Sequence, residues 1–166
     1  MTIAIYPGRF DPVTAGHLDI VNRASRLFDQ IIIAVFEAPE NQTMFNTKER
    51  IAMFEESIST LSNVSVKSFS GLIVDYARSQ NAKAIVRGIR MNADFEYEFE
   101  MALMNRKLAP DIDVVCLMTD IQYQFVRASL LKEVARLGGD IGGLAPVNVI
   151  HQLKIRIAQE TKHIEE

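Results

Sequence analysis

Residues 6–21, YPGRFDPVTAGHLDIV, bring together the residue types that bind phosphate. An apolar run typical of a strand enters this stretch and a helical pattern leaves it, so Gly16 and His17 fall in the first turn of a helix. That turn exposes backbone N–H groups without partners, which attract anions. A glycine there lets a ligand approach the backbone closely, and a histidine can donate a hydrogen bond to a phosphate oxygen. The stretch therefore predicts a site that closes over the phosphates of a nucleotide.

The glycines of this stretch follow neither of the two common nucleotide-binding patterns, G-x-G-x-x-G and G-x-x-x-x-G-K-[ST]. Taken alone, these glycines would indicate a turn and nothing more, and His17 would be an ordinary surface residue. The combination of a strand, G-x-F-D-P and then T-x-G-H at a helix start favours phosphate binding, with Thr14 as the cap of the helix. A second group of glycines follows a helix and predicts a helix end and a turn: Gly138, Gly139, Gly142 and Gly143.

Short apolar runs alternate with helical patterns along the chain. The predicted strands are residues 2–7, 30–36, 64–69, 82–88 and 113–118. The predicted helices are residues 17–28, 72–80, 93–108, 128–137 and 147–159, together with one that Asn46 caps. This alternation predicts one α/β domain over residues 1–166, a Rossmann-like, doubly wound, five-stranded parallel sheet with helices on both faces. Residues 147–166 are expected to form a C-terminal helix and a frayed tail.

Ligands of such sheets bind beyond the carboxyl ends of the strands, near the point where the strand order reverses. The loops expected to carry the site are residues 7–16, 37–46, 70–73, 88–94 and 119–128. Arg87 and Arg90 follow the fourth strand. They could be solvated surface charges, but their place at this edge favours contact with an anionic ligand.

Length and composition exclude several classes of protein. A chain of 166 residues suits one domain, and its net charge of -3 argues against nucleic-acid binding. No apolar stretch reaches about 18 residues and the first residues do not resemble a signal peptide, so we expect no membrane association and a cytoplasmic location. The single Cys116, in the apolar run IDVVCLM, is predicted to be a buried core thiol.

Four segments in order carry a resemblance to a known family. PGRFDPVTAGH resembles the signature of nucleotidyltransferases with a (T/H)-x-G-H motif. IVRGIR, ADFEYEFEMALMNRKLAP and SLLKEVARLGGDI are similar to the corresponding segments of bacterial phosphopantetheine adenylyltransferases, and the likeness runs from residue 3 to about residue 153. The resemblance implies transfer of the adenylyl group of ATP to 4′-phosphopantetheine in coenzyme A biosynthesis, with Mg²⁺ as cofactor. It also implies a homohexamer, with coenzyme A as a possible feedback ligand.

The resemblance implies roles for individual residues. His17 contacts the α-phosphate in the transition state, and Arg90 and Arg9 join it as catalytic residues. The ATP site would comprise Arg9, Phe10, His17, Gly88, Ile89, Arg90, Glu98, Tyr123, Gln124, Phe125, Val126, Arg127, Ala128 and Ser129. The acceptor site would comprise Arg9, Asn41, Leu72, Ile73 and Arg87. No side chain is predicted to bind the metal ion.

The chain departs from the family at three places. Arg9 stands where Thr or Ser is usual, Asn41 or Gln42 stands where a lysine is usual, and Val126–Ser129 replace a serine-rich loop. We hypothesise that Arg9 or Arg127 supplies the missing positive charge. The alternatives are reduced activity or a different substrate.

Three functions stay open at this point. The first is the adenylyltransferase of coenzyme A biosynthesis. The second is a sister nucleotidyltransferase with another phosphorylated acceptor, such as nicotinamide mononucleotide or glycerol phosphate. The third is a non-catalytic module that binds a nucleotide or coenzyme A. Residues 93–108 have apolar side chains on two sides, which indicates either one broad buried face or contact with another subunit.

Overall fold

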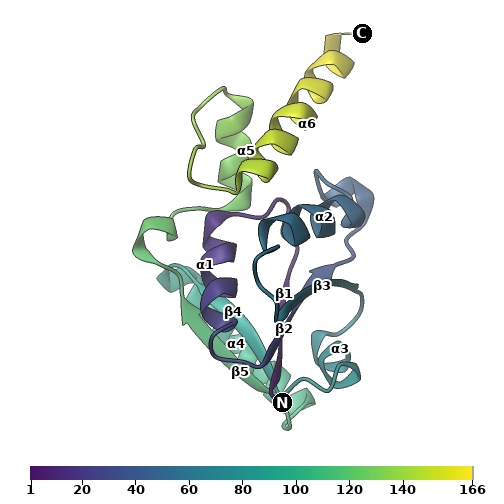
Figure 1. The fold of residues 1–166 in the computed structure, drawn as a ribbon, viewed down its shortest axis with the longest axis vertical. Helices are drawn as coiled ribbons and strands as arrows, with labels where there is room; N and C mark the ends of the chain where they lie inside the picture. Colours follow the sequence, from purple (N-terminus) through teal and green to yellow (C-terminus); the bar gives the residue numbers. More distant parts are fainter. Residues whose placement is uncertain (166) are drawn as a thin grey trace.

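Five parallel strands form the centre of the molecule (Figure 1). The computed structural model describes residues 1–165, apart from the side chains of Glu40, Asn92, Ala93 and residues 162–165. The strands are β1 (Ile3–Gly8), β2 (Gln30–Phe36), β3 (Val64–Phe69), β4 (Ala84–Ile89) and β5 (Asp113–Met118). Their order in the sheet is β3-β2-β1-β4-β5. The predicted α/β class and doubly wound parallel sheet are confirmed, with the order reversing between β1 and β4.

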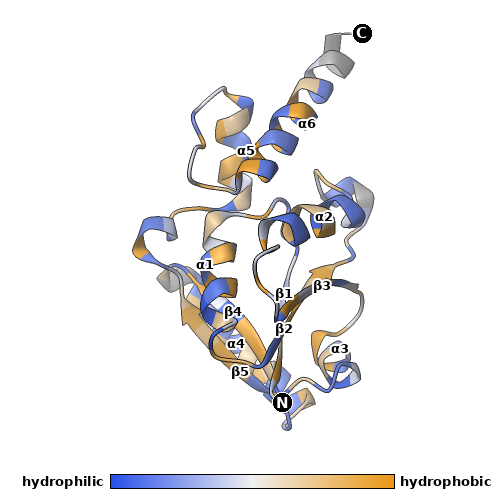
Figure 2. Ribbon diagram, viewed as in Figure 1, coloured by the Kyte–Doolittle hydropathy of each residue, from blue (hydrophilic) through white to orange (hydrophobic). Residues whose placement is uncertain are grey.

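Helices cover both faces of this sheet because successive strand side chains point to opposite sides. Tyr6 and Ile33 belong to one apolar cluster, and Ile5 and Ile32 belong to the other. The first cluster is covered by α1 (Ala15–Ala24), α2 (Thr47–Ser57), α5 (Ala128–Arg136) and α6 (Val147–Glu165). The second is covered by α3 (Ile73–Ser79), while α4 (Asn92–Leu108) packs along β4 and β5 behind the sheet in Figure 1. Figure 2 shows the hydrophobic residues gathered in the strands.

The sheet opens at its carboxyl edge between β1 and β4. These two strands pair only at Ala4 with Ala84 and at Ile5 with Ile85, whereas β1 pairs with β2 along its full length. The backbone N–H and C=O of Ile3 and every second residue after it face β4, since Ile3 accepts a hydrogen bond from Lys83. Pro7 is in this set and has no N–H, so it ends the ladder there. The two strands therefore diverge where the strand order reverses.

Two helices end several residues away from the predicted C-terminal bound. The helix α1 stops at Ala24 and does not reach residue 28. The side-chain amide of Asn63 donates to the carbonyl groups of Ser25 and Phe28 and so holds the turn that follows. At the other end of the chain, α6 runs through the segment expected to fray and ends at Glu165. An ion pair between Glu160 and Arg136 ties this part of α6 to α5.

The prediction of a buried Cys116 is wrong. The residue lies on β5, an edge strand of the sheet, and its side chain is exposed. The apolar run resembles a strand covered on both faces, but only part of β5 is covered. No helix in residues 1–165 is both long and apolar enough to cross a membrane.

The position of α6 leads to a prediction about stability. Leu153 of α6 is fully buried in the cluster that also holds Val21 and Phe54. The substitution Leu153→Ala should lower the free energy of unfolding by about 2–5 kcal/mol, measured by urea denaturation. As a control, Leu137→Ala at an 82% exposed site should change it by less than about 0.5 kcal/mol. A loss for Leu153→Ala as small as that of the control would show that α6 adds nothing to the core.

Candidate functional site

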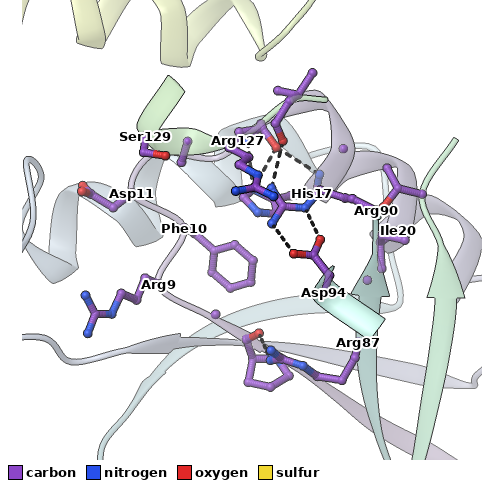
Figure 3. A pocket seen from close by; sticks show the side chains of 18 of the residues that line it. Arg9, Phe10, Asp11, His17, Ile20, Arg87, Arg90, Asp94, Arg127 and Ser129 are labelled. Atoms are coloured by element: carbon purple, nitrogen blue, oxygen red, sulfur yellow. Dashed lines mark hydrogen bonds and ion pairs between the residues drawn. The ribbon is translucent and has the colours of Figure 1, made fainter. Parts of the chain in front are cut away.

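A polar cavity of about 530 Å³ lies where β1 and β4 diverge. Its walls come from the loop after β1, the first turn of α1, the end of β4, the start of α4 and the start of α5. The side chains that define its chemistry are Arg9, Asp11, His17, Arg87, Arg90, Asp94, Glu98, Arg127 and Lys132. Figure 3 shows several of these side chains meeting above the ring of Phe10.

His17 is held in one protonation state by the helix cap. Its Nδ1 accepts a hydrogen bond from the backbone N–H of Thr14 at 3.0 Å, while the Thr14 hydroxyl accepts one from the His17 N–H at 3.4 Å. Nδ1 is therefore unprotonated and the neutral ring carries its proton on Nε2. Burial, and then the charge of Arg90, lower the pKa of His17 from 6.5 to about 3. The side chain can act in the cavity as a neutral hydrogen-bond donor.

Phe10 supports this imidazole from below. Its ring centroid lies 5.0 Å from that of His17 and 4.8 Å from that of Phe54, both edge to face. Phe10 has a φ of 50°, in the left-handed region that non-glycine residues rarely adopt. A Cβ at Gly8 would come within 2.7 Å of the Phe10 ring, so only glycine allows this packing. The local backbone is built to place the ring under His17.

Three cations of the cavity are neutralised by neighbouring carboxylates. Two carboxylates of α4 pair with the arginines at the end of β4: Arg87–Glu98 at 2.5 Å and Arg90–Asp94 at 2.9 Å. The third pair is Lys132–Asp11 at 2.7 Å. Burial alone would lower the pKa of the Arg87 guanidinium, but the hydrogen bonds and charge of Glu98 outweigh it and raise that pKa.

Arg9 and Arg127 are the two remaining cations of the cavity wall. Within the described residues neither side chain forms an ion pair or a hydrogen bond. Both are exposed, and they come from different segments, the loop after β1 and the residue before α5 (Figure 3). The net positive charge of the cavity therefore comes from these two side chains.

A second, apolar cavity of about 500 Å³ adjoins the first. The two share Pro7, Gly8, Arg9, Arg87, Tyr97 and Glu98. Most of the other lining is aliphatic, aromatic or thioether: Phe36, Phe69, Leu72, Ile73, Val74, Ile85, Met101, Ala102, Met104, Leu108 and Val114. An anionic group and an apolar chain of one ligand could thus lie on either side of the shared wall.

The structure brings most of the predicted site residues together. The polar cavity is lined by Arg9, Phe10, His17, Gly88, Arg90, Glu98, Val126, Arg127, Ala128 and Ser129. Leu72 and Ile73 line the apolar cavity, and Arg87 lines both.

Five predicted residues lie outside both linings. Ile89 is buried in the core, and Asn41 is exposed while its neighbours Gln42 and Thr43 face the polar cavity. Tyr123, Gln124 and Phe125 also lie outside, because the chain forms the short 3-10 helix η2 (Ile121–Tyr123) before it reaches the cavity at Val126.

Sequence reasoning did not assign Asp94 or Lys132 to the cavity, nor did it single out Arg50, which lines neither cavity but bonds the backbone of Arg9. Asp94 had a local signal, since it lies four residues after Arg90 in the first turn of a helix. Arg50 is fully buried and falls at helical spacing before Phe54, so the apolar face of α2 pointed to it. Lys132 pairs with Asp11 across 121 residues, and no local pattern marks such a contact.

Comparisons with known proteins show the family and agree with the fold. The cytidylyltransferase-like family model matches residues 5–134. The chain is 53% identical to a phosphopantetheine adenylyltransferase of Roseiflexus sp., covering 93% of this chain and 96% of that one. It is 48% identical to that of Desulfosudis oleivorans, covering 98% and 97%. A nicotinate-nucleotide adenylyltransferase structure from Vibrio parahaemolyticus, described as putative, has a TM-score of 0.68 over 92% of this chain and 99% of that chain. At 18% identity it shows the fold alone.

The lowered pKa of His17 predicts a loss of stability in acid. The unfolded chain takes up a proton at His17 below about pH 6.5, whereas the folded chain does so only near pH 3. The unfolded state therefore binds more protons between these values, and stability falls as the pH drops through this window. His17→Gln should remove about 1–2 kcal/mol of the stability lost between roughly pH 7 and pH 5. Urea denaturation at both pH values measures it, with His151→Gln at an exposed site as the control. Identical pH dependence of His17→Gln and the unsubstituted protein would contradict a His17 ring that stays neutral in the folded protein.

Proposed function

Because this chain belongs to the phosphopantetheine adenylyltransferase family, we propose that it transfers the adenylyl group of ATP to 4′-phosphopantetheine. The products would be dephospho-coenzyme A and pyrophosphate, a step of coenzyme A biosynthesis. The observation that carries the proposal is the wall of Arg9 and Arg87 between a polar and an apolar cavity. The triphosphate would occupy the polar cavity and the pantetheine arm the apolar one, so the acceptor phosphate would meet ATP at this wall.

The reaction makes one bond and breaks one. An oxygen of the acceptor phosphate forms a bond to the α-phosphorus of ATP, and the bond from that phosphorus to the bridging oxygen of the pyrophosphate breaks. The acceptor phosphate is already an anion, so no general base is required. The protein has to hold two anions together and stabilise the charge that grows on the α-phosphate and the leaving group.

The side chains of the polar cavity suit this task. The Nε2–H of His17 would donate to an α-phosphate oxygen, and its neutral state keeps that proton in place at physiological pH. Arg90 is fixed by Asp94 and by the carbonyl group of Val126 at 3.2 Å, so it adds a guanidinium without needing to reorganise. Arg87 uses three of its N–H groups on Glu98 and Pro7, which leaves two for the acceptor phosphate.

Mg²⁺ would enter with ATP as part of this proposal. Asp11, Asp94 and Glu98 each pair with a cation, and the described residues contain no cluster of three metal-binding side chains. This arrangement fits a Mg²⁺ ion held by triphosphate oxygens and water, which is its usual mode of binding. When bound, the ion would neutralise charge on the leaving pyrophosphate.

We also propose that the chain assembles as a homo-oligomer, and the family resemblance favours a homohexamer. Six large apolar side chains of α4 are 45–59% exposed: Phe95, Tyr97, Phe99, Leu103, Met104 and Leu108. Tyr97, Met104 and Leu108 line the apolar cavity, whereas Phe95, Phe99 and Leu103 lie on another side of the helix. An exposed apolar stripe such as the second set usually packs against another subunit. Coenzyme A, which resembles the product, would act as a feedback ligand. The reaction would take place in the cytoplasm, where ATP is available.

An acceptor assay tests the function. Pyrophosphate release is measured with ATP and Mg²⁺ in the presence of 4′-phosphopantetheine, nicotinamide mononucleotide or glycerol phosphate. Release with 4′-phosphopantetheine, at a rate far above the other two, is the expected result. Preferential use of another acceptor would assign a sister reaction, and binding of ATP without release would assign a non-catalytic module.

Arg9, which has no ion-pair partner among the described side chains, leads to a kinetic prediction. Arg9→Ala should lower turnover about 100-fold, because the cavity loses one of the two positive charges that none of the described carboxylates neutralises. Arg127→Ala should lower it about tenfold, since that side chain lies outside the shared wall. Steady-state pyrophosphate release measures both, with Arg26→Ala at an exposed site as the control. Near-wild-type turnover of Arg9→Ala would reject the idea that Arg9 replaces the lysine usual in the family.

A further inference from the structure

Charged side chains from three elements hold the backbone of Met44 and Phe45. The N–H groups of both residues donate to the carboxylate of Asp11, at 3.0 and 2.9 Å. The carbonyl group of Met44 accepts a hydrogen bond from Nη1 of Arg156 on α6 at 2.5 Å. The carbonyl group of Phe45 accepts one from Nε of Arg50 on α2 at 3.0 Å. All four backbone hydrogen-bonding groups of this dipeptide are therefore fixed by charged partners.

On its inner side the dipeptide connects to the polar cavity. Asp11 lines that cavity and is buried, with only 7% of its surface exposed. Arg50, which bonds Phe45, also donates to the carbonyl group of Arg9 at 2.6 Å. Phe45 thus contacts both charged groups that hold residues 9–11, the carboxylate of Asp11 and the guanidinium of Arg50. This segment includes the strained Phe10.

On its outer side the dipeptide connects to the C-terminal helix. The Arg156 guanidinium lies over the ring of Phe45 at 5.0 Å from its centroid and forms an ion pair with Glu49. Glu49 also accepts a hydrogen bond from the N–H of Asn46, the cap of α2. Arg156 lines neither of the two cavities described above. Its direct contacts to Met44 and Phe45 connect it to the site.

We propose that Arg156 is a positioning residue for the phosphate-binding loop. It fixes Met44 and Phe45 from outside, and these residues fix Asp11 and, through Arg50, the backbone of Arg9. Without it, the Met44 carbonyl group loses its donor and the Phe45 ring loses the cation above it. The amides that hold Asp11 would then shift. A displacement of about 1 Å at a phosphate-binding loop is enough to lower reactivity about 100-fold.

The test compares two arginines that both tie α6 to the rest of the chain. Arg156→Ala should weaken ATP binding, measured by calorimetry without acceptor, by about 10- to 100-fold. The control is Arg136→Ala, which removes the Arg136–Glu160 pair between α5 and α6 but no contact to Met44 or Phe45. It should leave ATP binding within about twofold of the unsubstituted protein. Thermal unfolding of both variants establishes the temperature at which each is folded, and binding is compared there.

Two further variants separate positioning from a general loss of structure. Arg156→Lys keeps a donor for Met44 and should recover part of the ATP affinity. In an Asp11→Asn background, Arg156→Ala should add little to the loss already present, because both changes act on one chain of contacts. Unchanged ATP affinity in Arg156→Ala, or fully additive effects in the double variant, would overturn the proposal.

The kinetic part of this inference rests on the proposed function, but the binding part does not. The expected kinetic result is a lower kcat/KM for ATP with the KM for 4′-phosphopantetheine changed less than about threefold. A protein that releases no pyrophosphate yet loses ATP affinity in Arg156→Ala would reject the proposed function and keep Arg156 as a positioning residue. If the protein is active but Arg156→Ala leaves its ATP affinity unchanged, the proposed function stands and the positioning role of Arg156 is rejected.

Discussion

The arrangement of the site depends on one buried carboxylate, that of Asp11. Leaving such a group unpaired in the interior would cost several kcal/mol, because it loses its hydration. Here its two oxygens take the N–H groups of Met44 and Phe45 and the ammonium group of Lys132. Asp11 and its partners belong to three segments that are far apart in the sequence. Each segment therefore satisfies the charge only if the other two are in place, and this requirement fixes three walls of the polar cavity together.

The arginines of the polar cavity are of two kinds, those that are paired with a described carboxylate and those that are not. Arg87 and Arg90 are oriented by carboxylates of α4, so they have fixed positions but contribute little net charge. Arg9 and Arg127 contribute charge but have no fixed partner among the described residues. A neutral His17 fits this division, since a third free positive charge beside Arg90 would be unfavourable. The fixed groups provide preorganised geometry, and the free ones provide the attraction for a polyanion.

What the sequence could predict follows from how local each cause is. Short-range patterns predicted three features: the Thr14 cap, the doubly wound parallel sheet and the edge of the sheet at which ligands bind. The exposure of Cys116 was not, because an apolar run does not reveal whether its strand is central or at an edge. The Asp11–Lys132 pair depends on the complete fold. Arg50 lies between these cases: its place on the apolar face of α2 was visible, but its carbonyl partners were not.

The wall that the polar and apolar cavities share results from a proline at the end of β1. Pro7 lacks the N–H group that would continue the ladder from β1 to β4, so the strands part just before their ends. The carbonyl group of Pro7 still faces β4 and would be left without a donor in the opened edge. The guanidinium of Arg87 supplies that donor at 3.1 Å and binds Glu98 with its other side. One residue that cannot donate thus opens the sheet, and the arginine that compensates for it becomes the divider between the polar and apolar cavities.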